Sequence, residues 1–244
     1  MSGRITIAGT GIAVVAHATA QTRAAIQSAA KVYFLAPDPV SARWIENLNP
    51  CAESLNDCLE RGQPRAPAYE AMADRVLAAA AAGVDVCAVF YGHPSVLVQP
   101  VRLIRTRAVS AGVDVSIVPA ISAQDCLFAD LGIDPGAGGL QSFEATEFLV
   151  RDRHPDPTCQ LFLWQVGVIG QPLHLQDADG DTFSMDALRK LQTRLSQAYG
   201  AEHEVILYEA ALYAVCNPRI TRLPLAALCE TPIAAHASLF VPRL

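Results

Sequence analysis

Short apolar runs and amphipathic stretches take turns along the first half of the chain. Four β-branched or apolar runs predict buried strands, at 4–8, 32–35, 84–90 and 113–118. Four stretches rich in helix-forming residues separate or follow them, at 21–31, 42–48, 68–83 and 96–112. Because strands and helices alternate, we expect parallel strands joined by crossover helices.

The pattern changes after Pro119. Ser122 is expected to cap a short helix that ends near Gly132, and the glycine-rich segment 134–141 is interpreted as a linker or loop. The elements predicted beyond it are a strand at 160–167, a polar loop at 172–183, an amphipathic helix at 184–200 with Leu188, Leu191 and Leu195 on one stripe, and strands at 204–213 and 234–242. The predicted fold class is therefore α/β, with two α/β domains, residues 1–120 and 121–244.

Composition supports a folded protein with a large core. Of the 244 residues, 52% are apolar and 17% charged, a balance that favours a large core over disorder. The formal net charge is −6, and no stretch is rich in Lys or Arg, so we expect no nucleic-acid partner. No apolar run reaches the roughly 18–20 residues of a membrane span, and the N-terminus lacks a signal-peptide pattern, so we expect no membrane partner.

The cysteines and histidines do not form a metal or disulfide pattern. Seven cysteines are present, an odd number, and no two have C-x-x-C spacing. We therefore expect buried free thiols and a cytoplasmic location. The five histidines outside the 84–100 stretch are scattered, and "DADGD" at 177–181 lacks the glycine position and closing Glu of a calcium loop, so it is interpreted as a solvated turn and no metal site is expected.

Three short motifs can each be interpreted in two ways. "YGHP" at 91–94 ends an apolar run, either as a simple strand-ending turn or as the floor of a ligand site at a strand's carboxyl end. Gly9-Thr10-Gly11 resembles half of a dinucleotide fingerprint, but Val14 replaces the third glycine, which leaves a tight structural turn or a close approach to a ligand. Arg65 and Tyr69, four residues apart, either pack together near a helix start or place both polar ends on one side.

Several blocks taken together resemble one known family. Gly9-Thr10-Gly11, "FYGHPSV", "PAISAQDCLFADLGIDP", "FEATEFLVRDR" and "LWQVG" occur in the order and at the intervals of the tetrapyrrole-methylase-type S-adenosylmethionine methyltransferases. Within that superfamily the sequence is most similar to the borosin peptide α-N-methyltransferases. The resemblance extends from Ile5 to about Pro242.

The resemblance implies that S-adenosyl-L-methionine is the cofactor and lies in a cleft between the two domains. It implies cofactor contacts from strand-end loops and from the last strand: Gly9, Thr10, Gly11, Tyr91, His93, Val96, Ser122, Ala123, Gln165, Tyr208, Ala210, Ala211, Leu212 and Ser238. In this interpretation Gly92 and Pro94 shape a loop that turns Tyr91 and His93 toward the cofactor, with His93 as a positioning group rather than a base.

The resemblance also implies methylation of backbone amide nitrogens, with Arg65 and Tyr69 as catalytic residues. A cationic Arg near the amide oxygen and a Tyr hydroxyl as donor or proton relay suit the loss of a weakly acidic N–H proton. Two tyrosines of the family pattern align with Asn56 and Leu59, neither of which has a phenol. This departure leaves open a small-molecule, tetrapyrrole-like substrate or a non-catalytic, cofactor-binding relative.

The sequence ends at Leu244, where the catalytic domain of such enzymes is expected to end, whereas fused borosins carry their peptide on a C-terminal extension. We therefore expect a separate precursor peptide as substrate. The resemblance further implies a homodimer.

Overall fold

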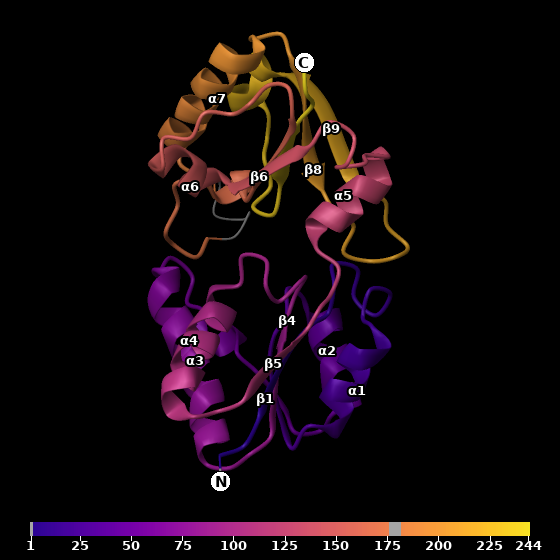
Figure 1. Cartoon of the computed structure of the whole chain (residues 1–244), viewed down its shortest axis with the longest axis vertical. Helices are drawn as coiled ribbons and strands as arrows, with labels where there is room; N and C mark the ends of the chain where they lie inside the picture. Colours follow the sequence, from indigo (N-terminus) through magenta and orange to yellow (C-terminus); the bar gives the residue numbers. More distant parts are fainter. Residues whose placement is uncertain (1, 176–181) are drawn as a thin grey trace. The chain divides into compact units, whose positions relative to one another are not determined.

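The computed structural model describes residues 2–175 and 182–244, and Figure 1 traces the chain. The chain forms two compact units. Unit 1 comprises Met1–Ala123 and Ala211–Cys216, and unit 2 comprises Gln124–Ala210 and Asn217–Leu244. The segment "DADGD", interpreted above as a turn, lies outside the described residues.

Unit 1 contains a five-stranded sheet in the order β3-β2-β4-β1-β5. Its strands are β1 (Ile5–Gly9), β2 (Lys31–Leu35), β3 (Ala52–Ser54), β4 (Val86–Phe90) and β5 (Val115–Val118). All pairs are parallel, which confirms the pairing expected from the alternating pattern. The sequence pattern missed β3, because three half-exposed or exposed residues carry too little periodicity to mark a strand.

Helices cover both faces of this sheet. They are α1 (Ala20–Ser28), α2 (Pro39–Leu48), α3 (Arg65–Ala81) and α4 (Gln99–Ala111), with a short 3₁₀ helix η1 (Asn56–Cys58) after β3. Figure 1 shows α3 and α4 on one side of the sheet and α1 and α2 on the other. The strands therefore pack into two separate apolar clusters, and all five residues of β4 are buried. This burial on both faces explains the unbroken apolar run in the sequence.

The helix predicted at 96–112 begins later than expected. Leu97 has a left-handed backbone, with φ of 57°, which no α-helix accommodates, so α4 starts at Gln99. Its end agrees with the prediction: Gly112 adopts the left-handed conformation (φ of 63°) that glycine tolerates at a helix terminus.

Unit 2 contains a mixed five-stranded sheet in the order β6-β7-β10-β8-β9. The strands are β6 (Leu140–Glu144), β7 (Gln160–Trp164), β8 (Glu204–Glu209), β9 (Arg219–Pro224) and β10 (Ser238–Val241). Only β6 and β7 are parallel; β10 runs antiparallel to β7 and β8, and β9 antiparallel to β8. The predicted linker at 134–141 therefore overlaps the start of β6, and the strand predicted at 204–213 ends at Glu209.

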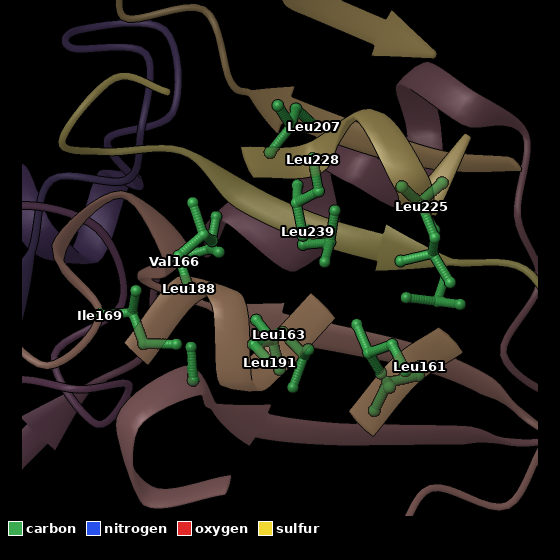
Figure 2. Close-up of a cluster of buried hydrophobic side chains, with 14 of the residues drawn as sticks. Leu161, Leu163, Val166, Ile169, Leu188, Leu191, Leu207, Leu225, Leu228 and Leu239 are labelled. Atoms are coloured by element: carbon green, nitrogen blue, oxygen red, sulfur yellow. The ribbon is translucent and has the colours of Figure 1, made fainter. Parts of the chain in front are cut away.

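The two faces of this sheet carry different helices. Those of unit 2 are α5 (Ala123–Leu131), α6 (Ala145–Val150) and α7 (Met185–Tyr199), with the 3₁₀ helices η2 (Val166–Val168) and η4 (Leu225–Glu230). On one face, Leu188 and Leu191 of α7 meet Leu163 of β7 and Leu239 of β10, as Figure 2 shows. The stripe predicted on α7 is confirmed, because its three leucines are fully buried. On the other face, α5 packs through Leu127.

The thiols are free, as expected, but most of them are not buried. Cys87 is fully buried in β4, whereas Cys51 and Cys216 are exposed and the other four are half-buried. Within the described residues, no helix has the length and apolar character needed to cross a membrane. The same residues contain no group of three or more potential metal ligands.

Candidate functional site

The loops that follow β1 and β4 are joined at the carboxyl edge of the unit 1 sheet. The backbone N–H of Thr10 donates to the carbonyl of Phe90 at 3.0 Å. One residue further on, Gly11 and Gly92 exchange two backbone hydrogen bonds of 3.2 and 3.1 Å. Two of the sequence blocks that carry the family resemblance therefore meet in space, at the edge where ligands bind in open α/β sheets.

Gly9 is required by close packing of these loops. A Cβ atom at this position would lie 2.3 Å from the carbonyl oxygen of Gly92 and 2.6 Å from Cδ of Pro94. Gly92 is required for a different reason, since its φ of 72° lies in the left-handed region. The glycines and Pro94 thus bring the two loops into contact. This close packing supports the interpretation of Gly9 as part of a tight structural turn.

The His93 ring is held in a defined orientation by its own loop. Its Nδ1 accepts a hydrogen bond from the backbone N–H of Ser95 at 3.1 Å, and its carbonyl accepts from Val96 N–H at 3.0 Å. A neutral imidazole whose Nδ1 accepts must carry its proton on Nε2. His93 can therefore present an N–H donor, which suits an acceptor such as a carboxylate. Tyr91 and His93 are both half-buried.

Left-handed backbone at non-glycine residues occurs beside these predicted contacts. Val15 has a φ of 69°, Leu97 a φ of 57° and Gln165 a φ of 58°. Val15 follows the β1 loop, Leu97 follows Val96, and Gln165 is itself a predicted contact. Such backbone is costly for residues with a side chain, most of all for β-branched Val15, and it concentrates at functional sites.

The segment 211–216 belongs to unit 1 and adds two more predicted contacts to this region. The carbonyl of Leu212 accepts a hydrogen bond from Val14 N–H at 3.2 Å, next to the Gly9–Gly11 turn. The Tyr213 hydroxyl donates to Oδ1 of Asp38 at 2.9 Å. Leu212 is therefore tied to the β1 loop, and Tyr213, which the sequence did not single out, lies beside these predicted contacts.

Asp38 is a strong hydrogen-bond acceptor at the start of α2. It caps the helix by accepting from the backbone N–H groups of Val40 and Ser41 at 2.8 and 2.9 Å, and it also accepts from the Ser41 hydroxyl. Burial acts to raise the pKa of Asp38, but hydrogen bonds from Ser41, Tyr213 and Val40 outweigh it, so the pKa is lowered. The hydrogen bond to Asp38, followed by burial, raises the pKa of Tyr213.

Arg65 and Tyr69 occupy the first turns of α3. Because α3 follows β3 and returns the chain to the start of β4, its first turn lies at the carboxyl edge of the parallel sheet. Both residues are half-buried, and Tyr69 packs against the apolar cluster under α3 and α4. The structure thus places the two predicted catalytic residues at the same edge of unit 1 as the loops after β1 and β4.

The Asn56 side chain, at a position where the family pattern has a tyrosine, stabilises a loop. Its side-chain amide accepts a hydrogen bond from Ala36 N–H at 3.2 Å and donates to the Ala36 carbonyl at 3.0 Å, while its Oδ1 also accepts from the Ser54 hydroxyl. It therefore fixes the loop that leads from β2 to Asp38. Leu59 packs partly buried against the same cluster as Tyr69.

In unit 2, the four predicted contacts lie at one end of the sheet strands, where Tyr208 pairs with Ser238. Ser238 begins β10, and because β10 runs antiparallel to β7 and β8, Gln165 and Ala210 follow their strands at that end. Tyr208 differs, since its side chain is buried and its hydroxyl donates to Asp130 of α5 at 2.6 Å. The Tyr208 side chain therefore stabilises the packing of α5, the helix of the "CLFADLGIDP" block.

Ser122 and Ala123 mark the point where the chain leaves unit 1 after β5. Ser122 is buried and immediately precedes α5, where the sequence placed a helix start. The capping hydrogen bond expected of Ser122 stays a prediction.

A profile of the family described as "Tetrapyrrole (Corrin/Porphyrin) Methylases" matches residues 4–229. The chain belongs to this family. Solved structures agree in fold. The structure of a uroporphyrin-III-C-methyltransferase from Thermus thermophilus superposes with a TM-score of 0.70 at 16% identity. The alignment covers 100% of this chain and 93% of that chain. Cobalamin biosynthesis precorrin-6Y methylase from Archaeoglobus fulgidus gives 0.63 at 17% identity, covering 99% of both.

Curated relatives with higher sequence identity are fungal methyltransferase/peptide precursors. The gymnopeptides precursor of Gymnopus fusipes is 37% identical over 97% of this chain and 56% of its own length. The omphalotin A precursor of Omphalotus olearius is 37% identical over 96% and 55%, and a type I borosin cyclic peptide precursor of Serendipita vermifera subsp. bescii is 37% identical over 86% and 50%. The resemblance to borosin-type proteins is thereby confirmed, and the chain spans about half the length of these relatives.

Proposed function

We propose that this family member is an S-adenosyl-L-methionine-dependent methyltransferase that methylates backbone amide nitrogens of a separate precursor peptide. The observation that carries the proposal is the joining of the β1 and β4 loops through Gly11 and Gly92, with α3 beginning at the same sheet edge. The relatives' names, which pair a methyltransferase with a cyclic peptide precursor, support the same reaction class.

The carboxyl edge of unit 1 fits an amino-acid-bearing donor. The Nε2–H of His93 can donate to a carboxylate, and the joined loops bring the other proposed contacts, Gly9, Thr10, Gly11, Tyr91, Ala211 and Leu212, to the same edge. When bound, S-adenosylmethionine supplies an electrophilic methyl group on a sulfonium. Gln165, Tyr208, Ala210 and Ser238 of unit 2 remain proposed contacts to the same donor, as do Val96, Ser122 and Ala123 of unit 1.

Amide N-methylation requires help with charge and with a proton. A peptide N–H is a very weak acid, so the developing charge on the amide oxygen must be stabilised while the nitrogen is held about 3 Å from the methyl carbon. We propose that the Arg65 guanidinium stabilises the charge on the amide oxygen. We propose that the Tyr69 hydroxyl handles the proton, as hydrogen-bond donor or proton relay.

One observation favours a second candidate. Asn56 and Leu59 stand where the family pattern has tyrosines, and Asn56 is committed to Ala36 by two hydrogen bonds. A site with fewer phenols has fewer groups to relay an amide proton, which favours a more acidic acceptor. The alternative is therefore a small-molecule, tetrapyrrole-like methyltransferase of the same fold, or a cofactor-binding relative without activity.

We also infer a homodimer, from the family resemblance, and a cytoplasmic location. Seven free thiols, two of them exposed, are typical of proteins from a reducing compartment.

The experiment supplies the protein with radiolabelled S-adenosylmethionine and a mixed library of synthetic dodecapeptides. The proposal predicts label in the peptide fraction and formation of S-adenosylhomocysteine. Label only in a small molecule added in parallel, such as a reduced porphyrin, would support the alternative. Donor binding without any transfer would identify an inactive relative.

A further inference from the structure

A groove of about 670 Å³ runs beside α4 in unit 1, and none of the predicted donor contacts lines it. One end is formed by Pro94 and Ser95, directly after His93 at the carboxyl edge of the sheet. The other end is formed by Val113 and Asp114, just after α4 ends. The groove therefore follows the whole helix, whose 13 residues span about 20 Å, the length of about six residues of extended peptide.

An open strand edge begins at one end of the groove. β5 is the last strand in the sheet order, and its only partner among the described strands is β1. Asp114 and Val115, the first residue of β5, line the groove, so the unpaired side of β5 borders it where the strand begins. An edge strand of this kind offers backbone donors and acceptors to an added strand, a common mode of peptide recognition.

The groove carries positive charge that the chain does not neutralise. Arg102 and Arg105 of α4 both line it and are exposed, and within the described residues neither guanidinium has an ion pair or hydrogen bond. Arg107, on the same helix, pairs with Glu70 and Asp74 instead. Because the chain as a whole has a formal net charge of −6, two unpaired arginines on one groove favour an acidic ligand there.

The rest of the lining is largely apolar. It therefore favours a ligand that carries apolar side chains next to its acidic side chains. Val98, just before α4, and Val101 and Val109 of α4 line the groove, and Val109 is 82% exposed although apolar. Asp114 is the only carboxylate in the lining and stands at the end remote from Pro94. The groove therefore suits an extended segment with apolar and acidic side chains, without an acidic residue at the Asp114 end.

We propose that this groove docks an acidic, extended segment of the peptide substrate as an added strand on β5. This inference rests on the proposed function, peptide methylation in trans. The docked segment runs along α4 and leads to Pro94 and Ser95, so the residues beyond it reach the carboxyl edge, where His93, Arg65 and Tyr69 lie. The protein thereby recognises one segment of the peptide and methylates another, so the side chains of the methylated residues need not fit the groove.

The test measures binding by fluorescence anisotropy, with no methyl donor present. The probe is a fluorescein-labelled octapeptide, Val-Thr-Glu-Thr-Glu-Thr-Val-Thr, and a second probe has Lys in place of both Glu. The Arg102→Gln/Arg105→Gln double variant is expected to bind the acidic probe about tenfold more weakly, which corresponds to about 1.4 kcal/mol. The control is Arg4→Gln/Arg43→Gln, which removes the same charge from exposed sites of unit 1 outside the groove and is expected to leave affinity within about twofold.

A second pair of probes tests strand addition itself. Backbone hydrogen bonds of an added strand alternate along it, so N-methylation of one alternate set of peptide amides is expected to abolish binding, while N-methylation of the other set leaves binding intact. Equal effects of the two sets, or unchanged affinity of the Arg102→Gln/Arg105→Gln variant, would overturn the proposal.

Sedimentation velocity tests whether the groove is instead an interface between two copies of the chain. If the wild-type protein is a dimer that the Arg102→Gln/Arg105→Gln variant dissociates, the groove holds a second copy of the chain and the proposal is wrong. Since binding is measured without donor, a protein that binds the acidic probe but never methylates peptides would contradict the proposed function alone.

Discussion

The Tyr213 hydroxyl donates a hydrogen bond to Oδ1 of Asp38 at 2.9 Å, joining residues 175 positions apart in the sequence. Asp38 is already fixed as the cap of α2, so the bond holds the segment 211–216 against a rigid helix start. The segment is also tied to the β1 loop, by the hydrogen bond from Val14 N–H to the Leu212 carbonyl. Tyr213 is therefore a positioning residue for Ala211 and Leu212.

Replacing Tyr213 with Phe is expected to weaken S-adenosylmethionine binding several-fold without lowering the melting temperature of the donor-free protein. The segment 211–216 would lose one of its described hydrogen bonds to the rest of unit 1, while the core stays intact. Isothermal titration calorimetry measures the effect. Tyr33→Phe is the matched control, because the Tyr33 hydroxyl has no hydrogen bond among the described residues. Equal affinity of Tyr213→Phe and wild type would contradict this role.

Arg65→Ala is expected to reduce turnover by at least about a hundredfold while donor affinity stays close to wild type, because the guanidinium acts on the amide oxygen and not on the donor. Arg61→Ala, which removes the same charge just before α3, serves as the control and should retain turnover. Single-turnover transfer and calorimetry separate the two effects. Loss of donor binding in Arg65→Ala would show that the assigned role is wrong.

Restoring a phenol at Asn56 is expected to cost stability. Asn56→Tyr removes both hydrogen bonds to Ala36, and at this exposed position the loss is about 1 kcal/mol in the free energy of unfolding. Leu59→Tyr removes no described hydrogen bond and should cost less. Urea unfolding compares the two variants, and an Asn56→Tyr protein as stable as wild type would refute the structural task given to Asn56.

Alkaline pH is expected to destabilise the protein through Cys87. Burial raises the pKa of the Cys87 thiol from 9.0 to about 12. The folded state therefore keeps a proton that the unfolded state loses above about pH 9, so the stabilisation is complete below that pH and falls as the pH rises toward 12. Between pH 8 and pH 10 the free energy of unfolding should fall by about 1 kcal/mol more in wild type than in Cys87→Ala. Parallel pH profiles would contradict this.

Gly167→Ala is expected to destabilise unit 2 by about 1–3 kcal/mol, through overpacking. The added Cβ would lie 1.8 Å from the carbonyl oxygen of Ala234, so backbone must move. Gly136→Ala is the control, because its Cβ would meet only the Asp134 side chain. Thermal unfolding tests the difference. A melting temperature for Gly167→Ala equal to that of the control would show that this close approach is tolerated.

Local pattern predicted the central strands and the edge strand β5, but it missed the edge strands β3, β6 and β9. The strand at β4 and the helix α7 are evident because each buries a continuous or periodic set of apolar residues. β9 escaped prediction because it is an edge strand whose residues are mostly exposed, and β6 because its residues are half-buried and follow a glycine-rich turn.

The candidate site divides in a similar way. The glycines and Pro94 made the strand-end loops predictable, because an unusual backbone conformation or a close approach requires particular residue types at those positions. Tyr213 left none, because its importance depends on a contact with Asp38, far away in sequence. The single available signal was its position one residue after the predicted contacts Ala211 and Leu212.

The central claim is that this chain transfers a methyl group from S-adenosylmethionine to a backbone amide. The most direct test incubates the protein with trideuteromethyl S-adenosylmethionine and a peptide that it binds, then locates the label by tandem mass spectrometry. Amide methylation predicts fragment ions that place the trideuteromethyl group on a backbone nitrogen, and a loss of at least about a hundredfold in label when Arg65→Ala replaces wild type. Label on a side chain, or recovered only in a small molecule, would contradict it.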